Sequence, residues 1–456
     1  MKIKSSRLLA IGLAGVFSTA GSAFATNGYF MIGFGTGSVG MGGIGVTSPQ
    51  DSMCVGGNPA CLGEFETPRF DMSVGFIDPR RASGTTVMGA GAQPGGIYNW
   101  SGVNTYILPG MGFVFPFNDK LAFGFAALGN GGAGTTYKPN FFTGNNNEYL
   151  GVDLVQLIVP ITVTYKFDKT NTFGMSIVPA RQRFIAQGLS PFAPFSTDKD
   201  HLTDKGHDYA NGIGARVGWA GHFLDNKLTL GATYASKIYM QKFNLYKGLF
   251  AGAGGFDVPA NYAVGIGFKP VENLTVALDI QKILYSGIPS VGNRGPTPVG
   301  NGNLPTTCDP TVAVGVGNCS GTSLGAPEGS GFGWVDQTVY KLGVAYTNFW
   351  PSLFGANKLT VRAGYNYGKT PIQQDQLLFN LLAPATSEKH YTVGFTYSLG
   401  EQSIFGFGSE GALSMAYIES PLKKLEGPAI GTSGDTGIAS FQMKQKILDI
   451  AYTLKF

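Results

Sequence analysis

The sequence predicts an all-β protein: a 14-stranded antiparallel transmembrane β-barrel, with an N-terminal segment that plugs it. Three observations lead to this prediction. Charged residues make up 13% of the chain, which is about half their share in typical soluble domains. After the first 25 residues, no apolar run reaches the 18 residues expected of a transmembrane helix. Stretches that alternate between apolar and small or polar residues recur instead, and lipid suits their apolar face.

The first 25 residues have the features of a secretory signal peptide. Two lysines and an arginine occur within the first seven residues, and residues 8–17 are apolar. An A-x-A cleavage motif follows at 23–25. We therefore expect the exported chain to begin at Thr26 and to reside in the bacterial outer membrane, where single-chain β-barrels of this kind occur.

The stretch LIVPITVTYKF, residues 157–167, illustrates the strand signal. Apolar or aromatic residues occupy every second position from Leu157 to Phe167. A soluble β-sandwich also alternates, but its outward positions are charged, whereas here the polar face is mostly glycine, threonine or single charges. That composition suits a barrel lumen. Strands are predicted at residues 67–77, 105–117, 120–129, 153–167, 172–187, 209–223, 227–240, 258–269, 273–286, 333–348, 357–369, 387–399, 407–419 and 441–456.

The connections between these strands alternate in length. The short connections are 117–120, 168–171, 224–227 and 269–273, and the long ones are 130–152, 188–208, 241–257, 287–332 and 420–440. Short turns at one end and long loops at the other are typical of outer-membrane barrels. The last predicted strand ends on Phe456, and an alternating strand with a terminal aromatic residue resembles the signal read by the barrel assembly machinery.

Residues 26–65 break the alternation, because they are rich in glycine and have no sustained period. A 14-stranded barrel is too wide for its own side chains to fill, so we expect this segment to lie in the lumen. The chain therefore divides into a signal peptide at 1–25, an N-terminal hatch at 26–65 and a barrel at 66–456. Residues 40–45 match G-x-G-x-x-G, but they lack the preceding strand and following helix of a nucleotide site.

The run TNGYF…GSVGMGGIGV…QD…NPA in this segment resembles the hatch of the FadL/TodX family of outer-membrane transporters of hydrophobic compounds. Residues 178–189, 258–286 and 333–346 resemble strands of that family, so the resemblance extends over nearly the whole exported chain. It implies passive transport of hydrophobic molecules, most of all long-chain fatty acids, with monoaromatic hydrocarbons as the alternative. It also implies capture by external loops, binding in a tunnel, rearrangement of the hatch and lateral release.

The resemblance assigns roles to particular residues. Asn58, Pro59 and Ala60 match the NPA triplet of the family, and the hatch is expected to shift around them. The third strand of the family is kinked inward and leaves a gap in the wall. Gly124 and Gly129 are the candidates for this bend, because glycines within strands mark bulges and close approaches.

Four cysteines in an exported chain suggest disulfides. We expect a Cys54–Cys61 disulfide to fix the NPA turn and a Cys308–Cys319 disulfide to close the longest external loop. Pairing between the two sets remains an alternative, because spacing does not determine connectivity. In the chain-entropy treatment, closing so short a loop stabilises by roughly 2–3 kcal/mol. The spacing C-x6-C differs from that of zinc sites, and no metal or other cofactor is expected.

Basic residues on the strands are the candidate ligand contacts. Strand parity places Arg216, Lys341 and Arg362 on the lumen side, where an arginine would hold a carboxylate through two hydrogen bonds. The alternative is that these cations pair with carboxylates inside the barrel and contact no ligand. The candidate partners are Asp71, Asp279 and Asp336.

Two further arginines, Arg181 and Arg183, fall on the outward phase of their strand. A bulge at Pro179 would turn them inward. The family resemblance suggests that a basic residue in this stretch contacts the ligand.

Other functions have weaker support. The net charge of +4 is not gathered into a basic stripe, so nucleic acid is not an expected partner. Residues 196–208 hold a serine, histidines and aspartates, but a loop is a poor support for a nucleophile, and we do not expect an enzyme. A general diffusion porin, and an adhesin or barrel-borne enzyme that uses the 287–332 loop, remain alternatives.

The expected surroundings are membrane lipid and lipopolysaccharide. Aromatic residues in 137–142 and 244–256 are expected to capture ligand or to pack on each other.

Overall fold

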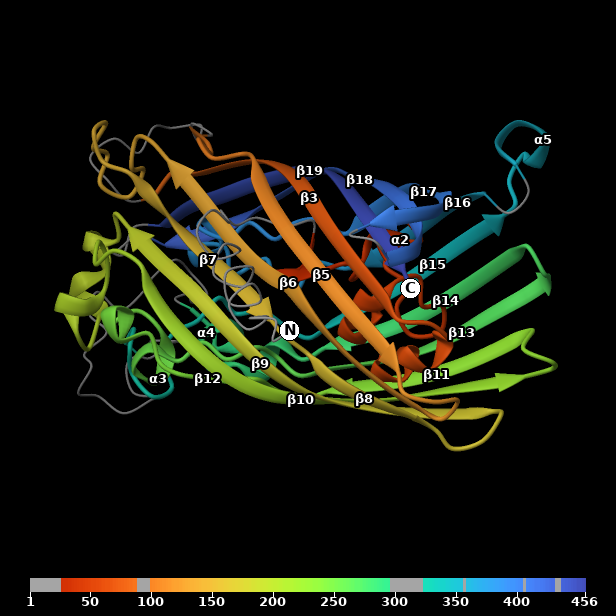
Figure 1. Ribbon diagram of the computed structural model, residues 1–456. Coiled ribbons are helices and arrows are strands. Elements are labelled where there is room, and N and C mark those ends of the chain that lie inside the picture. Colours follow the sequence, from red (N-terminus) through yellow and green to blue (C-terminus); the bar gives the residue numbers. More distant parts are fainter. Residues whose placement is uncertain (1–25, 88–98, 296–322, 356–357, 405–406, 431–435) are drawn as a thin grey trace.

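The computed structural model describes residues 26–87, 99–295, 323–355, 358–404, 407–430 and 436–456, which form one closed antiparallel barrel (Figure 1). The wall strands follow one another in chain order, and the last pairs with the first. They are β3 (Arg69–Thr85), β5 (Tyr106–Pro116), β6 (Leu121–Tyr137), β7 (Leu150–Ile158) continued by β8 (Ile161–Lys166), β9 (Asn171–Gln187), β10 (Asp208–Phe223), β11 (Leu228–Ala235), β13 (Asn261–Val271), β14 (Leu274–Ile283), β15 (Gln337–Thr347), β16 (Leu359–Gly368), β17 (Lys389–Ile404), β18 (Phe407–Ile430) and β19 (Thr436–Lys455).

The predicted 14-stranded barrel is confirmed, with β7 and β8 counted as one wall strand. This strand is interrupted at Val159 and Pro160, where proline has no N–H to donate to the ladder. The prediction of a loop at 420–440 is wrong, because β18 continues to Ile430 and β19 starts at Thr436. The third wall strand is also longer than predicted, since β6 runs on to Tyr137.

The two ends of the barrel differ, as predicted from the connection lengths. Short turns join β5 to β6, β8 to β9, β10 to β11 and β13 to β14 at one end, toward the right of Figure 1. The opposite end, the loop end, carries most of the remaining short elements. These are η3 (Ser190–Phe195), η4 (Lys199–His201), β12 (Tyr239–Met240), η5 (Asn244–Tyr246), α3 (Ala251–Gly254), η6 (Tyr285–Gly287), α4 (Pro289–Gly292) and η7 (Phe379–Leu381). Two others are β4 (Asn99–Trp100), which pairs with β3, and α5 (Pro351–Phe354), in the turn before β16.

The outer face of the wall is apolar. On β9, for example, Phe173, Met175 and Ile177 point outward and are 51%, 62% and 57% exposed. Water would make this exposure costly, whereas lipid does not, which accounts for the low share of charged residues in the chain. No helix among the described residues has both the length and the hydropathy of a membrane span.

The N-terminal segment, residues 26–65, lies inside the barrel (Figure 1, red). Its elements are β1 (Thr26–Asn27), β2 (Phe30–Met31), α2 (Thr36–Gly40), η1 (Ser52–Gly56) and η2 (Pro59–Glu64). Inward-facing glycines on the wall let it approach closely. A Cβ atom on Gly174 would lie 2.2 Å from the carbonyl carbon of Pro59, and one on Gly218 would lie 1.9 Å from Oδ1 of Asn58. The glycine content of the strands thus reflects a close backbone-to-wall contact.

Candidate functional site

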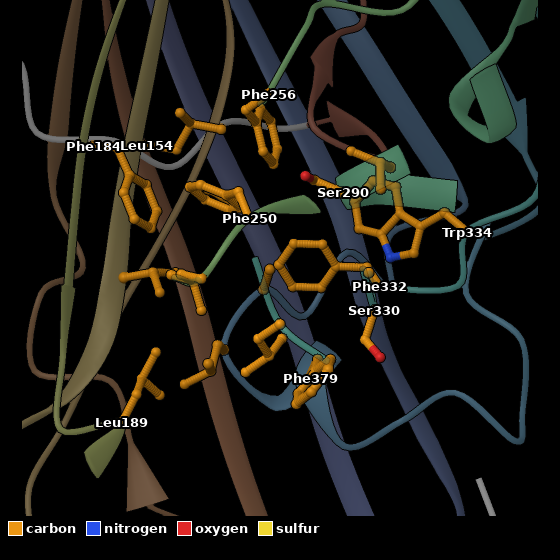
Figure 2. A pocket seen from close by; sticks show the side chains of 18 of the residues that line it. Leu154, Phe184, Leu189, Phe250, Phe256, Ser290, Ser330, Phe332, Trp334 and Phe379 are labelled. Atoms are coloured by element: carbon orange, nitrogen blue, oxygen red, sulfur yellow. The ribbon is translucent and has the colours of Figure 1, made fainter. Parts of the chain in front are cut away.

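An apolar pocket lies at the loop end of the lumen, above the N-terminal segment. Figure 2 shows the rings of Phe250, Phe256 and Phe332 directed into one space, with wall residue Phe184 on one side and Trp334 on the other. The unfilled volume is about 70 Å³, well below the roughly 300 Å³ at which pockets for drug-sized ligands begin. A larger ligand therefore needs side chains to move apart. The other lining residues are Tyr29, Ala133, Val152, Leu154, Leu189, Phe192, Leu249, Ser290, Val291, Leu324, Ser330, Gly331, Phe379, Leu382 and Ala383.

The loop aromatics expected at the outer mouth are buried instead and pack on one another. Phe250 lies 4.7 Å from Phe184 and 4.9 Å from Phe256, measured between ring centroids. Phe142 packs edge-on against Phe192, at 5.1 Å. Of the two alternatives for residues 137–142 and 244–256, mutual packing is the one that is found, and it forms part of the pocket wall.

The floor of the pocket is the hairpin of β1 and β2. Tyr29 lines the pocket, and its backbone N–H donates to the hydroxyl oxygen of Tyr285 at 3.3 Å. The Tyr285 hydroxyl in turn donates to the backbone carbonyl of Asn27. Burial raises the pKa of Tyr285 far above its ordinary value, so its hydroxyl stays protonated and holds the hairpin.

Arg216, Lys341 and Arg362 face the lumen, as strand parity predicts, but each contacts the N-terminal segment. Arg216 donates to the carbonyl of Gly57 at 2.8 Å. Nζ of Lys341 donates to the carbonyls of Ile32 and Gly43, at 2.9 and 3.1 Å. Nε of Arg362 donates to Oε1 of Gln50 at 2.9 Å. Each therefore has a partner in the N-terminal segment, which we call the plug, and Arg362 also donates to the Thr396 hydroxyl of the wall at 2.8 Å. None of the three lines the apolar pocket.

Three lumen carboxylates hold the same segment from other sides of the wall. Asp279 accepts from the backbone N–H groups of Gly45 and Val46, at 2.8 and 3.0 Å. Asp71 accepts from the backbone N–H of Ser52 at 2.8 Å, and Asp449 accepts from the hydroxyl of Thr36. Asp279 thus binds the plug, Asp71 is shared between the plug and Arg69 of the wall, with which it pairs at 2.8 Å, and Asp336 accepts from Ser286 in the loop region.

The NPA triplet is the most firmly held part of the N-terminal segment. Nδ2 of Asn58 donates to the carbonyls of Val46 and Trp219, and its Oδ1 accepts from the N–H of Ala60. The carbonyl of Pro59 accepts from the Thr164 hydroxyl at 2.6 Å. The predicted Cys54–Cys61 disulfide is present and closes this turn. Cys308 and Cys319 lie outside the described residues.

A second, smaller pocket lies beneath the hairpin, between the N-terminal segment and the wall. It has about 40 Å³ of unfilled volume. Arg216, Lys341, Asp279 and Asn130 line it from the wall, and Phe30 lines it from the hairpin. The lumen therefore has an apolar compartment above the hairpin and a charged compartment below it.

Arg181 and Arg183 lie on the outer face of β9, where parity puts them. The pairing of β9 with β10 has no register shift from Asn171 to Phe184, so the inversion expected at Pro179 is absent. Arg181 stacks over Tyr209 at 5.0 Å, and Arg183 pairs with Asp153 at 2.9 Å.

The wall is incompletely paired between β5 and β6. These strands pair only from Met111–Ala127 to Pro116–Ala122. Beyond Ala127, β6 pairs with β7 and, at Gly131, with Phe30 of the N-terminal segment. The remainder of β5 pairs with β3 alone, so the described strand pairing leaves an opening at this level.

The two glycines expected at a bend occupy different situations around this opening. Gly124 is in regular register with both neighbouring strands, and its missing Cβ makes room for Leu62. Gly129 adjoins a register shift between β6 and β7 that leaves Asn130 unpaired. The side chain of Leu108 covers Gly129, since a Cβ there would lie 2.1 Å from Leu108 Cδ1.

The loops above the apolar pocket are joined by an ionic contact. Asp198 accepts from Nδ1 of His201 at 2.9 Å and pairs with Nζ of Lys247 at 3.1 Å. The residues of 196–208 thus connect two loops, and no cluster of three metal-ligating side chains occurs in the described parts of the chain. These contacts, first that with His201 and then that with Lys247, lower the pKa of Asp198 to about 2.

Asp198→Asn is expected to loosen these loops. The lowered pKa means that the contact is fully formed above pH about 4 and is lost as the pH falls through about 2. Limited trypsin digestion at pH 7 should therefore cut the variant faster than the wild type. Added salt should speed cleavage of the wild type, because it screens this exposed ion pair. Asp200→Asn, an exposed change in the same loop, is the control. Equal cleavage of the wild type and Asp198→Asn would contradict this role.

Apart from the aromatics of 244–256, the pocket residues were not among those predicted from the sequence. Leu154 and Phe184 come from two strands, Val291 and Trp334 come from the loop between β14 and β15, and Phe379 comes from the loop between β16 and β17. The wall residues carry a signal in their inward parity. The loop residues carry none, because no local period relates them.

A closed barrel with an apolar outer face, a filled lumen and an apolar pocket under long loops defines a β-barrel membrane channel of the plugged type. A sequence model of the family described as outer membrane protein transport protein (OMPP1/FadL/TodX) matches residues 14–410, and the chain belongs to this family. Family members are outer-membrane barrels and transport channels.

Among curated relatives, the long-chain fatty acid transport protein of Escherichia coli K12 is 28% identical over 169 residues. That match covers 37% of this chain and 35% of the relative, and the same values apply to the protein of that description from Shigella flexneri. A Pseudomonas aeruginosa FadL homologue has a similar structure, with a TM-score of 0.65 at 15% identity, covering 93% of this chain and 99% of the homologue. The P. putida toluene transporter TodX gives 0.62 at 18% identity, with the same coverage. At these identities the structural similarity shows the fold.

Proposed function

We propose that this protein is a passive channel that takes hydrophobic molecules across the outer membrane, with long-chain fatty acids as the first candidate cargo. The observation that carries the proposal is the closed apolar pocket between the external loops and the plug. An apolar cargo gains free energy by leaving water for such a pocket, at roughly 25 cal/mol per Å² of surface buried. No energy source is needed for this step.

The two compartments support an amphiphilic cargo. Its chain would enter the apolar pocket once the lining side chains move apart, and its carboxylate would reach Arg216 and Lys341 once the hairpin between the compartments moves. The hairpin is the part of the plug proposed to move: the Tyr285 hydroxyl holds its Asn27 carbonyl and Tyr29 amide, and β6 holds it at Gly131 and Gly132. The NPA triplet acts in this scheme as the anchor around which the hairpin shifts.

The opening between β5 and β6 is the proposed exit. Phe30 of the hairpin pairs with Gly131 of β6 just inside it, so movement of the hairpin would uncover the opening. Leu108 covers Gly129 from the wall, and a cargo that displaced this side chain would pass into the membrane. The hatch role of residues 26–65 and the bend at Gly129 are thus parts of one proposed route.

Monoaromatic hydrocarbons are the second candidate cargo. The lining of the apolar pocket includes no charged side chain among the described residues, and aromatic rings form much of it. A neutral aromatic molecule would fill this pocket with no need of a cation. A general diffusion porin is disfavoured, because the N-terminal segment occupies the lumen. An enzymatic role has no support in the site.

Val291→Phe tests the pocket, because the added ring would occupy its unfilled volume. Val291 is 1% exposed, so the added ring has no other space to occupy. Overpacking costs about 1–3 kcal/mol, and cargo binding that is weakened by a similar free energy lowers uptake about tenfold. Uptake of labelled oleate and labelled toluene should be measured in cells lacking their own channels for these compounds. Val335→Phe, at a position 44% exposed, is the matched control. Uptake by the variant equal to wild type for both compounds would refute the pocket route. Restored uptake of only one compound by the wild type would identify the cargo class.

A further inference from the structure

The outer face of the barrel changes from apolar to charged at one level of the wall. Tyr417 on β18, Leu448 on β19 and Phe76 on β3 are direct neighbours across these strands and point outward. Phe76 is 40% exposed. The apolar surface of these three strands is interrupted beyond this row, because the next outward residues toward the loop end are charged; exposed Leu422 and Ile438 follow farther on.

The next outward row consists of Glu419, Lys446 and Asp78, again direct neighbours. One further row toward the loops, Lys444 lies directly opposite Arg80. Arg80, Lys444 and Lys446 are exposed, and Arg80 also pairs with Asp78 at 2.8 Å. We call Arg80, Lys444 and Lys446 the basic rim.

Two cations directly opposite each other on neighbouring strands repel, because their Cβ atoms are about 5 Å apart. The chain nevertheless places Lys444 opposite Arg80, at the height where the apolar surface is interrupted. An anion bound between them would remove the repulsion. At the boundary of a membrane the available anions are lipid headgroups. A phosphate group fits this pair of cations, because the arginine donates two parallel hydrogen bonds to it and the lysine adds a positive charge.

Basic residues follow the apolar surface on other strands too, but without this opposition. On β14, Lys282 follows outward-facing Ile280, and on β17, Lys389 lies one outward position beyond Tyr391. Arg183 already pairs with Asp153. Opposed cations also occur at the short-turn end, where Arg69 lies opposite Lys455, but there Asp71 and Glu410 pair with them. Among the described strand pairs on the loop side, β19 and β3 bring two cations face to face at the basic rim.

We propose that the basic rim binds a phosphate of the glycolipid in the loop-side leaflet, which in an outer membrane is the lipid A part of lipopolysaccharide. Arg80 and Lys444 hold the phosphate, Lys446 adds charge below it, and the acyl chains lie along the apolar surface that includes Phe76 and Leu448. This inference does not depend on which molecule the channel transports.

The test is binding of bisphosphorylated lipid A to the detergent-purified full barrel, followed by native mass spectrometry. The variant Arg80→Gln/Lys444→Gln/Lys446→Gln should bind at least about tenfold more weakly, since charge-assisted hydrogen bonds to phosphate are lost. The control is Lys120→Gln/Lys227→Gln/Lys269→Gln, which removes three exposed charges at the short-turn end. Heat-modifiable mobility on gels verifies that each barrel is folded, and cargo uptake should be unchanged in both.

Two further probes define the ligand. Wild-type protein should bind dephosphorylated lipid A about as weakly as the rim variant binds lipid A. Inorganic phosphate should bind much more weakly than lipid A, because it lacks the acyl chains. The proposal is overturned if the rim variant retains wild-type affinity, if the control loses as much, if dephosphorylated lipid A binds equally well, or if free phosphate binds as tightly as the lipid.

Discussion

Asp279→Ala is expected to turn the closed barrel into an ion-conducting pore. Asp279 is 1% exposed and accepts from the backbone N–H groups of Gly45 and Val46. Its removal leaves both donors without a partner, at about 1–3 kcal/mol each, so the plug should be released at least about thirtyfold more often. Single-channel conductance in planar bilayers measures this release directly.

Two comparisons make the Asp279 experiment specific. Asp279→Asn keeps one acceptor oxygen and should conduct at an intermediate level. Asp119→Ala removes the same charge from an exposed turn and should leave the barrel closed. Conductance of Asp279→Ala at the wild-type level would show that this carboxylate does not hold the plug.

Gly174→Ala is expected to undock the NPA turn while the barrel itself still folds. The added Cβ would lie 2.2 Å from the carbonyl carbon of Pro59, and a backbone atom cannot rotate out of the way. The hydrogen bond from the Thr164 hydroxyl to the Pro59 carbonyl should be lost as well. The cost exceeds the roughly 1–3 kcal/mol of an ordinary overpacking substitution, because the obstacle is main chain. Cargo uptake should fall severalfold and conductance should rise.

The matched control for Gly174→Ala is Gly408→Ala, because a Cβ at Gly408 would meet nothing within 4 Å. Both variants should retain the heat-modifiable mobility of a folded barrel. A Gly174→Ala protein with wild-type uptake and no conductance would mean that the plug can shift at Pro59 without losing its seal.

Strand alternation made the barrel predictable, and it also marks where prediction failed. On β9 the period of two runs unbroken from Asn171 to Gln187, so both its position and its lumen face were predictable. Alternation reflects a contrast between lipid and lumen, and that contrast disappears above the membrane. The upper part of β18 carries charges on exposed positions such as Lys424 and Glu426, so it reads as loop.

The sequence predicted which way the basic residues of the candidate site face, but not which groups they contact. Parity shows that Lys341 faces the lumen, yet only the folded structure brings the carbonyls of Ile32 and Gly43 to its ammonium group. The pocket was not predictable, because Phe250 and Phe379 meet the same space from loops more than a hundred residues apart. One signal was overlooked: inward-facing glycines, such as Gly174 and Gly218 on adjacent strands, mark where the plug approaches the wall.

The contacts of the N-terminal segment impose an order on assembly. Its later part, η1 and η2, contacts β5, β6, β8, β9 and β10, which leave the ribosome early. Its earlier part, α2, contacts β16, β17, β18 and β19, which are made last; Thr36 and Asp449, for example, are 413 positions apart. The earlier half of the plug is therefore fully seated only when the C-terminal strands are in place. Because β19 also closes the barrel against β3, sealing of the lumen and closure of the seam depend on the same strands.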